Sequence, residues 1–185
     1  MGMPSVQISF SEKAITAIQR GDKGIVALIL KDKSVNKITE SSDGATTEVE
    51  VVNIETATDI PVTISEANQR QIANALIGYT NAPKEVVVVL INDEAANYNE
   101  ALKKLETIKF NYLAIPTVET DGQIQTVATW IKEQRDNDRL VKAVLPNASV
   151  DMDGVINFAT EKVYINDTEY TAEQYCSRIA GLLAG

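Results

Sequence analysis

The sequence contains no histidine, and it has a single cysteine, Cys176, among its 185 residues. Without histidine the chain cannot form a Ser-His-Asp or Cys-His catalytic pair, an imidazole general base or a histidine-containing zinc site. One thiol cannot form an internal disulfide, which is typical of proteins from a reducing compartment. These absences exclude many classes of enzyme and indicate a protein made in the cytoplasm.

Positive charge is also scarce, since 17 Lys and Arg stand against 26 Asp and Glu for a formal net charge of −9. No basic cluster stands out, and the few aromatic residues (5%) are dispersed, so we expect no nucleic-acid partner. No stretch approaches the roughly 20 apolar residues of a membrane span, and the first ten residues lack the features of a secretion signal. We therefore expect no membrane insertion.

The chain does contain short, unbroken apolar runs with polar flanks, the pattern of strands that are buried on both sheet faces. Four such strands are predicted, at residues 24–30, 85–91, 112–115 and 140–145. Residues 46–54 differ because apolar and acidic residues alternate there, which predicts an exposed or edge strand. A further short strand is predicted at 162–165, before an Asn166-Asp167 turn.

Segments with helical spacing separate these strands. Four helices are predicted. The first begins after Thr63 or Ser65 and ends at Tyr79, and the second runs from Asp93 through Ile108. The third follows the Asp121-Gly122 turn and runs through Asp138, and the fourth runs from a capping box at Thr171 through Leu183. Alternating strands and helices with short connections imply right-handed βαβ units. The predicted fold is therefore a three-layer α/β domain, with a mostly parallel central sheet flanked by helices and a small β-hairpin or edge-strand region.

Three local patterns are candidates for chemistry, and each has a simpler structural interpretation. Asp151-Met152-Asp153-Gly154 resembles the opening of a calcium loop, but Lys162 stands where the closing glutamate is needed, so we interpret it as a turn. Asp93 and Glu94 are suited either to Mg²⁺ or to the start of a helix, whose dipole favours negative charge. Cys176 has no histidine to activate it and is interpreted as an inert, buried thiol. We predict no catalytic, cofactor-binding or metal-binding residues and no cofactor.

Several segments together resemble the contractile tail sheath proteins of bacteriophages and phage-tail-like bacteriocins. The order and spacing of the similar segments agree over essentially the whole chain. These segments are Pro4–Phe10, Ala17–Leu28, Phe110–Pro116, Gly154–Asn157 and Arg178–Gly185.

The resemblance implies a structural protein with a core called subtilisin-like for its sheet topology, and without peptidase activity. In this family many copies stack as rings around an inner tube and shorten to drive the tube through a cell envelope. The implied partners are other copies of the sheath subunit, the inner tail tube and baseplate proteins, within a phage tail or a released tail-like particle. Family members continue past the segment that resembles Arg178–Gly185, so we expect this chain to be a fragment.

The resemblance also implies a division into an N-terminal arm and lead-in (1–23) and an α/β core domain (24–185). Val6, Ile8 and Phe10 alternate with polar residues, which suits a strand that is added to the open sheet edge of a neighbouring subunit. The same segment is also suited to packing on its own domain.

Two other functions stay open on the sequence alone. One is a flavodoxin-like domain, either a small enzyme or a regulatory module, which binds a nucleotide or Mg²⁺ beyond the strand ends through Asp93 or Asp121. The other is an adaptor that presents an acidic face to a basic partner.

Overall fold

The structure, a computed structural model, describes residues 23–35, 48–165 and 168–185. Its centre is a six-stranded sheet in which all neighbours are parallel except β2, which runs antiparallel to β3 at one edge. In their order across the sheet, the strands are β2 (Val49–Ile54), β3 (Glu85–Asn92), β1 (Ile25–Asp32), β4 (Tyr112–Ala114), β5 (Lys142–Pro146) and β6 (Val155–Phe158).

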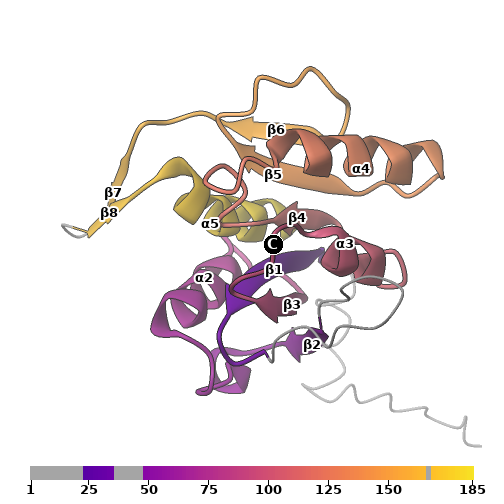
Figure 1. The fold of residues 1–185 in the computed structure, drawn as a ribbon. Helices are drawn as coiled ribbons and strands as arrows, with labels where there is room; N and C mark the ends of the chain where they lie inside the picture. Colours follow the sequence, from indigo (N-terminus) through magenta and orange to yellow (C-terminus); the bar gives the residue numbers. More distant parts are fainter. Residues whose placement is uncertain (1–22, 36–47, 166–167) are drawn as a thin grey trace, which may run out of the picture.

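Helices cover both faces of this sheet and form three layers with it (Figure 1). One face packs against α2 (Glu66–Ile77) and α5 (Ala172–Ala184), and the other packs against α3 (Asn99–Leu105) and α4 (Ile124–Asp136). This arrangement confirms the predicted three-layer α/β fold with a mostly parallel sheet. No helix in the described ranges has the length and apolar character needed to cross a membrane.

Two small elements lie outside the three layers. A short 3-10 helix, η1 (Ala57–Asp59), follows β2. Strands β7 (Val163–Ile165) and β8 (Thr168–Tyr170) form a separate antiparallel hairpin, which extends away from the sheet before α5 begins (Figure 1). The hairpin agrees with the predicted β-hairpin region.

The central strand explains why the apolar runs of this sequence are unbroken. In β1, Ala27 and Ile29 belong to the core on the α3 and α4 side, whereas Val26 and Leu28 belong to the core on the α2 and α5 side. All four side chains have an exposed fraction of 0%. Because both faces of a parallel sheet are covered, successive residues must all be apolar, which is the pattern that the sequence shows.

The four buried strands predicted from apolar runs correspond to β1, β3, β4 and β5. The alternating segment 46–54 contains β2, which is an edge strand as predicted. Strand β6 was not predicted, because it has only four residues and its side chains are half-buried or exposed. The predicted arm and the boundary at residue 23 fall in or next to residues 1–22, outside the described part of the chain, and so does the Asn166-Asp167 turn.

The helix predicted from Asp93 is wrong in its first six residues, since α3 begins at Asn99. Two asparagine side chains compete with helix formation there. The Asn92 side-chain oxygen accepts a hydrogen bond from the Glu94 amide (3.0 Å), and that of Asn97 accepts one from the Asn99 amide (3.0 Å). Such local turns satisfy backbone donors without a helix. Asp93 and Glu94 therefore lie in a turn after β3 and not at a helix start.

Candidate functional site

The carboxyl end of the sheet, where β1 lies between β3 and β4, is the place at which α/β folds of this kind usually bind ligands. From β1 the chain continues to β2 and β3 on one side of β1, and it then returns to β4 on the other side. The order in which strands are added across the sheet therefore reverses at β1. We define the switch-point network as Lys31 near the end of β1, Tyr98 before α3, and Thr117 and Asp121 in the β4–α4 loop.

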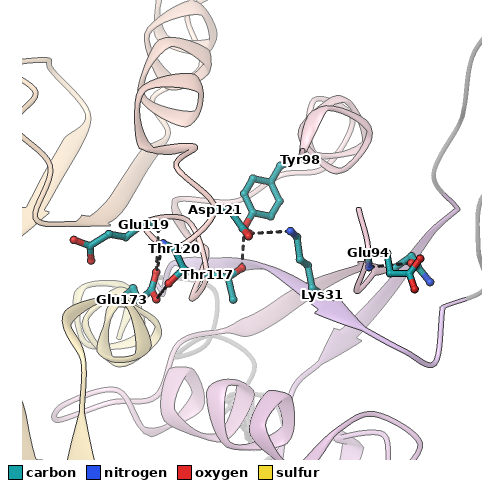
Figure 2. A network of polar contacts seen from close by, with 9 residues as sticks. Lys31, Glu94, Tyr98, Thr117, Glu119, Thr120, Asp121 and Glu173 are labelled. Carbon is teal, nitrogen blue, oxygen red and sulfur yellow. Dashed lines mark hydrogen bonds and ion pairs between the residues drawn. The ribbon is translucent and has the colours of Figure 1, made fainter. Parts of the chain in front are cut away.

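Within the switch-point network the four side chains bind one another (Figure 2). Lys31 Nζ lies 2.9 Å from Asp121 Oδ2 and 5.3 Å from the centre of the Tyr98 ring. The Tyr98 hydroxyl donates to the Asp121 carboxylate and lies 2.7 Å from the Thr117 hydroxyl oxygen. The chain thus fills its own switch point with a charge pair, hydrogen bonds and a cation–π contact.

The protonation states of the network follow from these contacts. Burial favours a raised pKa for Asp121, but the hydrogen bond from Tyr98 and the charge of Lys31 outweigh it and hold that pKa below its ordinary value. Burial and the neighbouring Asp121 carboxylate raise the pKa of Tyr98. Asp121 is therefore a carboxylate and Tyr98 a neutral phenol at neutral pH. Neither group is tuned to exchange a proton near pH 7, as a general acid or base would need to be.

A second set of contacts binds the β4–α4 loop to α5. The backbone amides of Glu119 and Thr120 each lie 3.1 Å from Glu173 Oε2, and the Thr120 hydroxyl lies 2.5 Å from Glu173 Oε1. Glu119 in turn accepts a hydrogen bond from Asn147 Nδ2 at 3.0 Å. Together with the switch-point network, these contacts connect the loop to β1, to Tyr98 before α3 and to α5 (Figure 2). The bond from Asn147 also connects the loop to the residues that follow β5.

Asp32, the last residue of β1, joins the same end of the sheet to α2. Its carboxylate is 4% exposed and accepts hydrogen bonds from the amides of Ser34 and Ser65 (2.9 Å each) and from Asn68 Nδ2 (2.7 Å). Burial opposes ionisation, but these donors prevail and hold the pKa of Asp32 well below its ordinary value. Asp32 is therefore a structural anchor for the start of α2.

The residues considered for metal binding are not brought together. Asp93 borders an open cavity of about 450 Å³ that is also lined by Lys31, Lys33 and Thr63, whereas Asp121 is engaged in the switch-point network. Among the described residues, no three acidic or thiol side chains lie close enough to hold a metal ion. Asp151–Gly154 is a turn, with Gly154 at a φ of +92°, as interpreted from the sequence.

Cys176 is buried in the core beneath α5. Burial, together with the charges of Glu173 and Glu119, raises the pKa of its thiol to about 12. The thiolate needed for nucleophilic chemistry is therefore disfavoured, in agreement with an inert thiol.

The two edges of the sheet are the other functional candidates. Among the described residues, β2 pairs only with β3 and β6 pairs only with β5. An unpaired edge offers backbone donors and acceptors to an added strand. β2 carries the charged Glu50, whereas β6 has no charged side chain.

The sequence does not predict the switch-point network, because its members are scattered along the chain and form no motif. Of the four residues, only Asp121 is a candidate from the sequence, as a ligand-binding residue. The signal that was present is the lysine at the end of β1, an unusual residue where a parallel strand is buried on both faces.

Residues 92–185 match the family model described as "Phage tail sheath protein central domain". A tail sheath protein of Clostridium phage phiCD119 is 34% identical over 190 residues, covering 99% of this chain and 48% of that protein. The phage-like element PBSX protein XkdK of Bacillus subtilis is 36% identical over 92 residues, covering 49% of this chain and 20% of that protein. The chain thus spans at most about half the length of these relatives.

Two solved structures share the fold. The sheath tail protein of Desulfitobacterium hafniense has a TM-score of 0.65 and 18% identity, covering 98% of this chain and 62% of that one. The sheath tail protein of Listeria innocua has a TM-score of 0.62 and 15% identity, covering 90% of this chain and 58% of that one. At these identities the likeness concerns the fold alone.

Proposed function

This chain belongs to the phage tail sheath protein family, a family of structural proteins and not of enzymes, and on that premise we propose that it is a subunit of a contractile tail sheath. The family match over residues 92–185 is the observation that carries the proposal. In this role, copies of the protein polymerise around an inner tube and contract to drive the tube through a cell envelope.

The proposed partners are other copies of the subunit, the inner tail tube and the baseplate. The protein is made in the bacterial cytoplasm and becomes part of a phage tail or of a tail-like particle. We divide the chain into an arm and lead-in at 1–23 and an α/β core domain at 24–185. The arm adds as a strand to a neighbouring subunit, since residues 6–10 have the two-residue period that such a strand requires.

Two features of the described core support this mechanism. The outer edges of β2 and β6 lack a strand partner among the described residues, so both are suited to strand addition. The carboxyl end of the sheet is bound together by the switch-point network and by the contacts of Glu173, so the core is suited to moving as one body. Contraction is then a rigid-body shift between subunits, during which the arm linkages keep the rings connected.

The flavodoxin-like alternative is weaker on two grounds. The family is structural, and the side chains at the switch point bind one another in place of a ligand. The acidic-adaptor alternative has no observation of its own in its favour.

The arm mechanism can be tested by deleting residues 1–10 from the protein in the phage tail or tail-like particle of which it is a part. We expect the deletion to abolish sheath polymerisation, seen by electron microscopy, while circular dichroism shows that the monomer stays folded. As a matched control, replacing Gln7 and Ser9 with Thr preserves the two-residue period and should leave sheaths intact. Normal sheaths from the deletion variant would refute strand addition by this segment.

A further inference from the structure

The chain leaves the core after β5 and returns to it at α5, and both points are bound to the same residue. Just after β5, Asn147 Nδ2 donates a hydrogen bond to the Glu119 carboxylate in the β4–α4 loop at 3.0 Å. In the first turn of α5, Glu173 Oε2 accepts a hydrogen bond from the Glu119 amide at 3.1 Å. We define residues 148–170, which lie between these two points and contain β6 and the β7–β8 hairpin, as the β6 flap.

The β6 flap is buried much less than the strands of the core. Among its described residues, 148–165 and 168–170, only Ala148 is buried, and the others are half-buried or exposed. In β5, the neighbour of β6, Ala143, Val144 and Leu145 each have an exposed fraction of 0%. Because folding is driven mainly by the burial of apolar surface, the flap is held in the closed position by a small share of the stabilising free energy.

The polar side-chain contacts of the β6 flap stay within the flap. The Ala148 amide donates to Asn157 Oδ1 at 2.9 Å, and the Tyr164 hydroxyl donates to the Glu169 carboxylate at 3.0 Å. Lys162 Nζ lies 2.7 Å from Glu169 Oε1. In the described part of the chain, no side-chain hydrogen bond or ion pair joins the flap to the core. The flap therefore keeps its own polar contacts when it moves away from the core.

One strand ladder and a few apolar contacts hold the closed β6 flap on the core. β6 pairs with β5 in parallel, and the Ala143 amide donates to the Gly154 carbonyl oxygen at 2.8 Å. The Phe158 ring centre lies 5.9 Å from that of Tyr175 in α5. The other apolar side chains of the flap that pack on the core are only partly buried: Val150, Met152, Val155 and Ile156.

The core stays closed without the β6 flap, because α5 packs directly on the strands that precede the flap. Cys176 and Ala180 of α5 belong to the same buried cluster as Val144 of β5. At its end, α5 is bound to the residue before β1, since the Gly24 amide donates to the Ala184 carbonyl oxygen. On the other face, α4 shares a buried cluster with the remaining side chains of β5. Detachment of the flap therefore removes only the edge partner of β5.

We propose that the β6 flap detaches from the core as one unit while the rest of the domain stays folded. Opening breaks the β5–β6 ladder and exposes the outer edge of β5, whose backbone donors and acceptors are then free to pair with another strand. The two ends of the flap stay fixed at Glu119, so the flap closes again at the same place. The proposal rests on the burial and bonding of the flap and not on the proposed function.

Native-state hydrogen exchange of the 185-residue chain tests the proposal, because each amide reports the opening that exposes it. We expect the β6 amides to exchange at least about tenfold faster than the buried amides of β1. Their exchange should also depend less on denaturant, because opening of the flap exposes less surface than global unfolding.

Two neighbouring amides of β5 sharpen this test. The Ala143 amide donates to Gly154 and should exchange together with the β6 amides. The Val144 amide faces β4, because successive amides of a strand point to opposite sides and the Lys142 amide donates to Asn111. It should therefore exchange as slowly as the amides of β1.

A pair of substitutions separates flap opening from global unfolding. Ile72→Val acts on α2, which packs on β1 and β3, and these strands are separated from β6 by β4 and β5. Because Ile72 is 0% exposed, its substitution should make the β1 amides exchange about threefold faster or more. The β6 amides should keep their wild-type rates within about twofold. The matched variant Phe158→Ala removes the contact with Tyr175 and should make the β6 amides exchange about tenfold faster.

Either of two results would overturn the proposal. One is exchange of the wild-type β6 amides at the rate and denaturant dependence of the β1 amides; the other is an acceleration of both sets by the same factor in Ile72→Val. Each would show that β6 opens only when the whole domain unfolds. Circular dichroism checks that the variants are folded, and the wild-type comparison decides alone if Phe158→Ala does not fold. None of these outcomes bears on sheath formation, so the proposed function is tested separately.

Discussion

The two ends of the sheet are held together by different kinds of contact. At the carboxyl end, polar side chains such as Lys31, Tyr98 and Asp121 bind one another across loops. At the amino end, backbone lies directly against backbone: the Gly24 amide donates to the Ala184 carbonyl oxygen at 2.8 Å, and α5 contacts α2 through Gly181. Side chains adjust when one is replaced, whereas packed backbone does not, so substitutions should cost most at the amino end.

The largest effect is expected at Gly181. A Cβ there would lie 2.0 Å from the Ala75 carbonyl oxygen, so any side chain forces α2 and α5 apart. We expect Gly181→Val to lower the free energy of unfolding by about 3 kcal/mol or more, or to prevent folding. Chemical denaturation measures the change. Leu182→Val, one residue along and partly exposed, should change it by less than about 0.5 kcal/mol. Equal effects of the two substitutions would contradict the close packing of α5 on α2.

A smaller loss is expected at the carboxyl end for Lys31→Met. The substitution removes the cation next to Asp121, whose side chain is 23% exposed and therefore partly hydrated. We expect a loss of about 1–2 kcal/mol in the free energy of unfolding, measured by denaturant titration. Lys33→Met changes the net charge by the same amount, but Lys33 is not a member of the network. This substitution should therefore leave the free energy of unfolding nearly unchanged. A loss for Lys33→Met as large as that for Lys31→Met would show that general charge, and not the network, is responsible.

The pH dependence of the free energy of unfolding tests the same network in another way. The pKa of Asp121 is lower in the folded state than in the unfolded chain, so its contribution is fully present above the unfolded value and is lost as pH falls below it. We expect stability to decline in acid below about pH 4. Asp121→Asn should make this decline shallower in melts recorded from pH 7 to pH 2. An unchanged slope for Asp121→Asn would argue against a lowered pKa.

A weaker and local effect is expected for Glu173→Gln. The neutral amide still accepts a hydrogen bond but loses the charge that strengthens the bonds from the Glu119 and Thr120 amides. We expect faster hydrogen exchange at these two amides, with a global loss below about 1 kcal/mol. Gln174→Glu on the next residue is the comparison, because it leaves the loop contacts in place. Unchanged exchange at Glu119 and Thr120 would show that Glu173 does not hold the loop.

The smallest expected effect is that of small ligands on thermal stability. A ligand that binds only the folded state raises the melting temperature by mass action. Since the side chains at the switch point bind one another, Mg²⁺ and nucleotides should shift the melting temperature of this chain by less than about 1 °C. A saturable shift of several degrees would favour the flavodoxin-like alternative.

The parts of the fold that depend on local pattern could be predicted from the sequence. The buried runs of β1 and β3 and the capping box at Thr171 carry their own signals, and each was found within a few residues of its observed bounds. The start of α3 was predicted too early, because acidic residues at 93 and 94 resemble a helix start while Asn92 and Asn97 form turns. Strand β6 is short and half-buried, so its pattern is weak.

The candidate site was less accessible to sequence reasoning. Lys31 and Asp121 are far apart in the chain and meet only because β1 and β4 are neighbours in the sheet. The network forms no local motif, so its prediction required the strand order.

The most direct test of the proposed role is electron microscopy of the protein produced together with the tube protein of its own tail. Sheath assembly around a tube is the property that separates a sheath subunit from a ligand-binding α/β domain. We expect helical sheaths of stacked rings on the tubes, in an extended or a contracted state. Bare tubes beside folded, unassembled protein would contradict the proposed role.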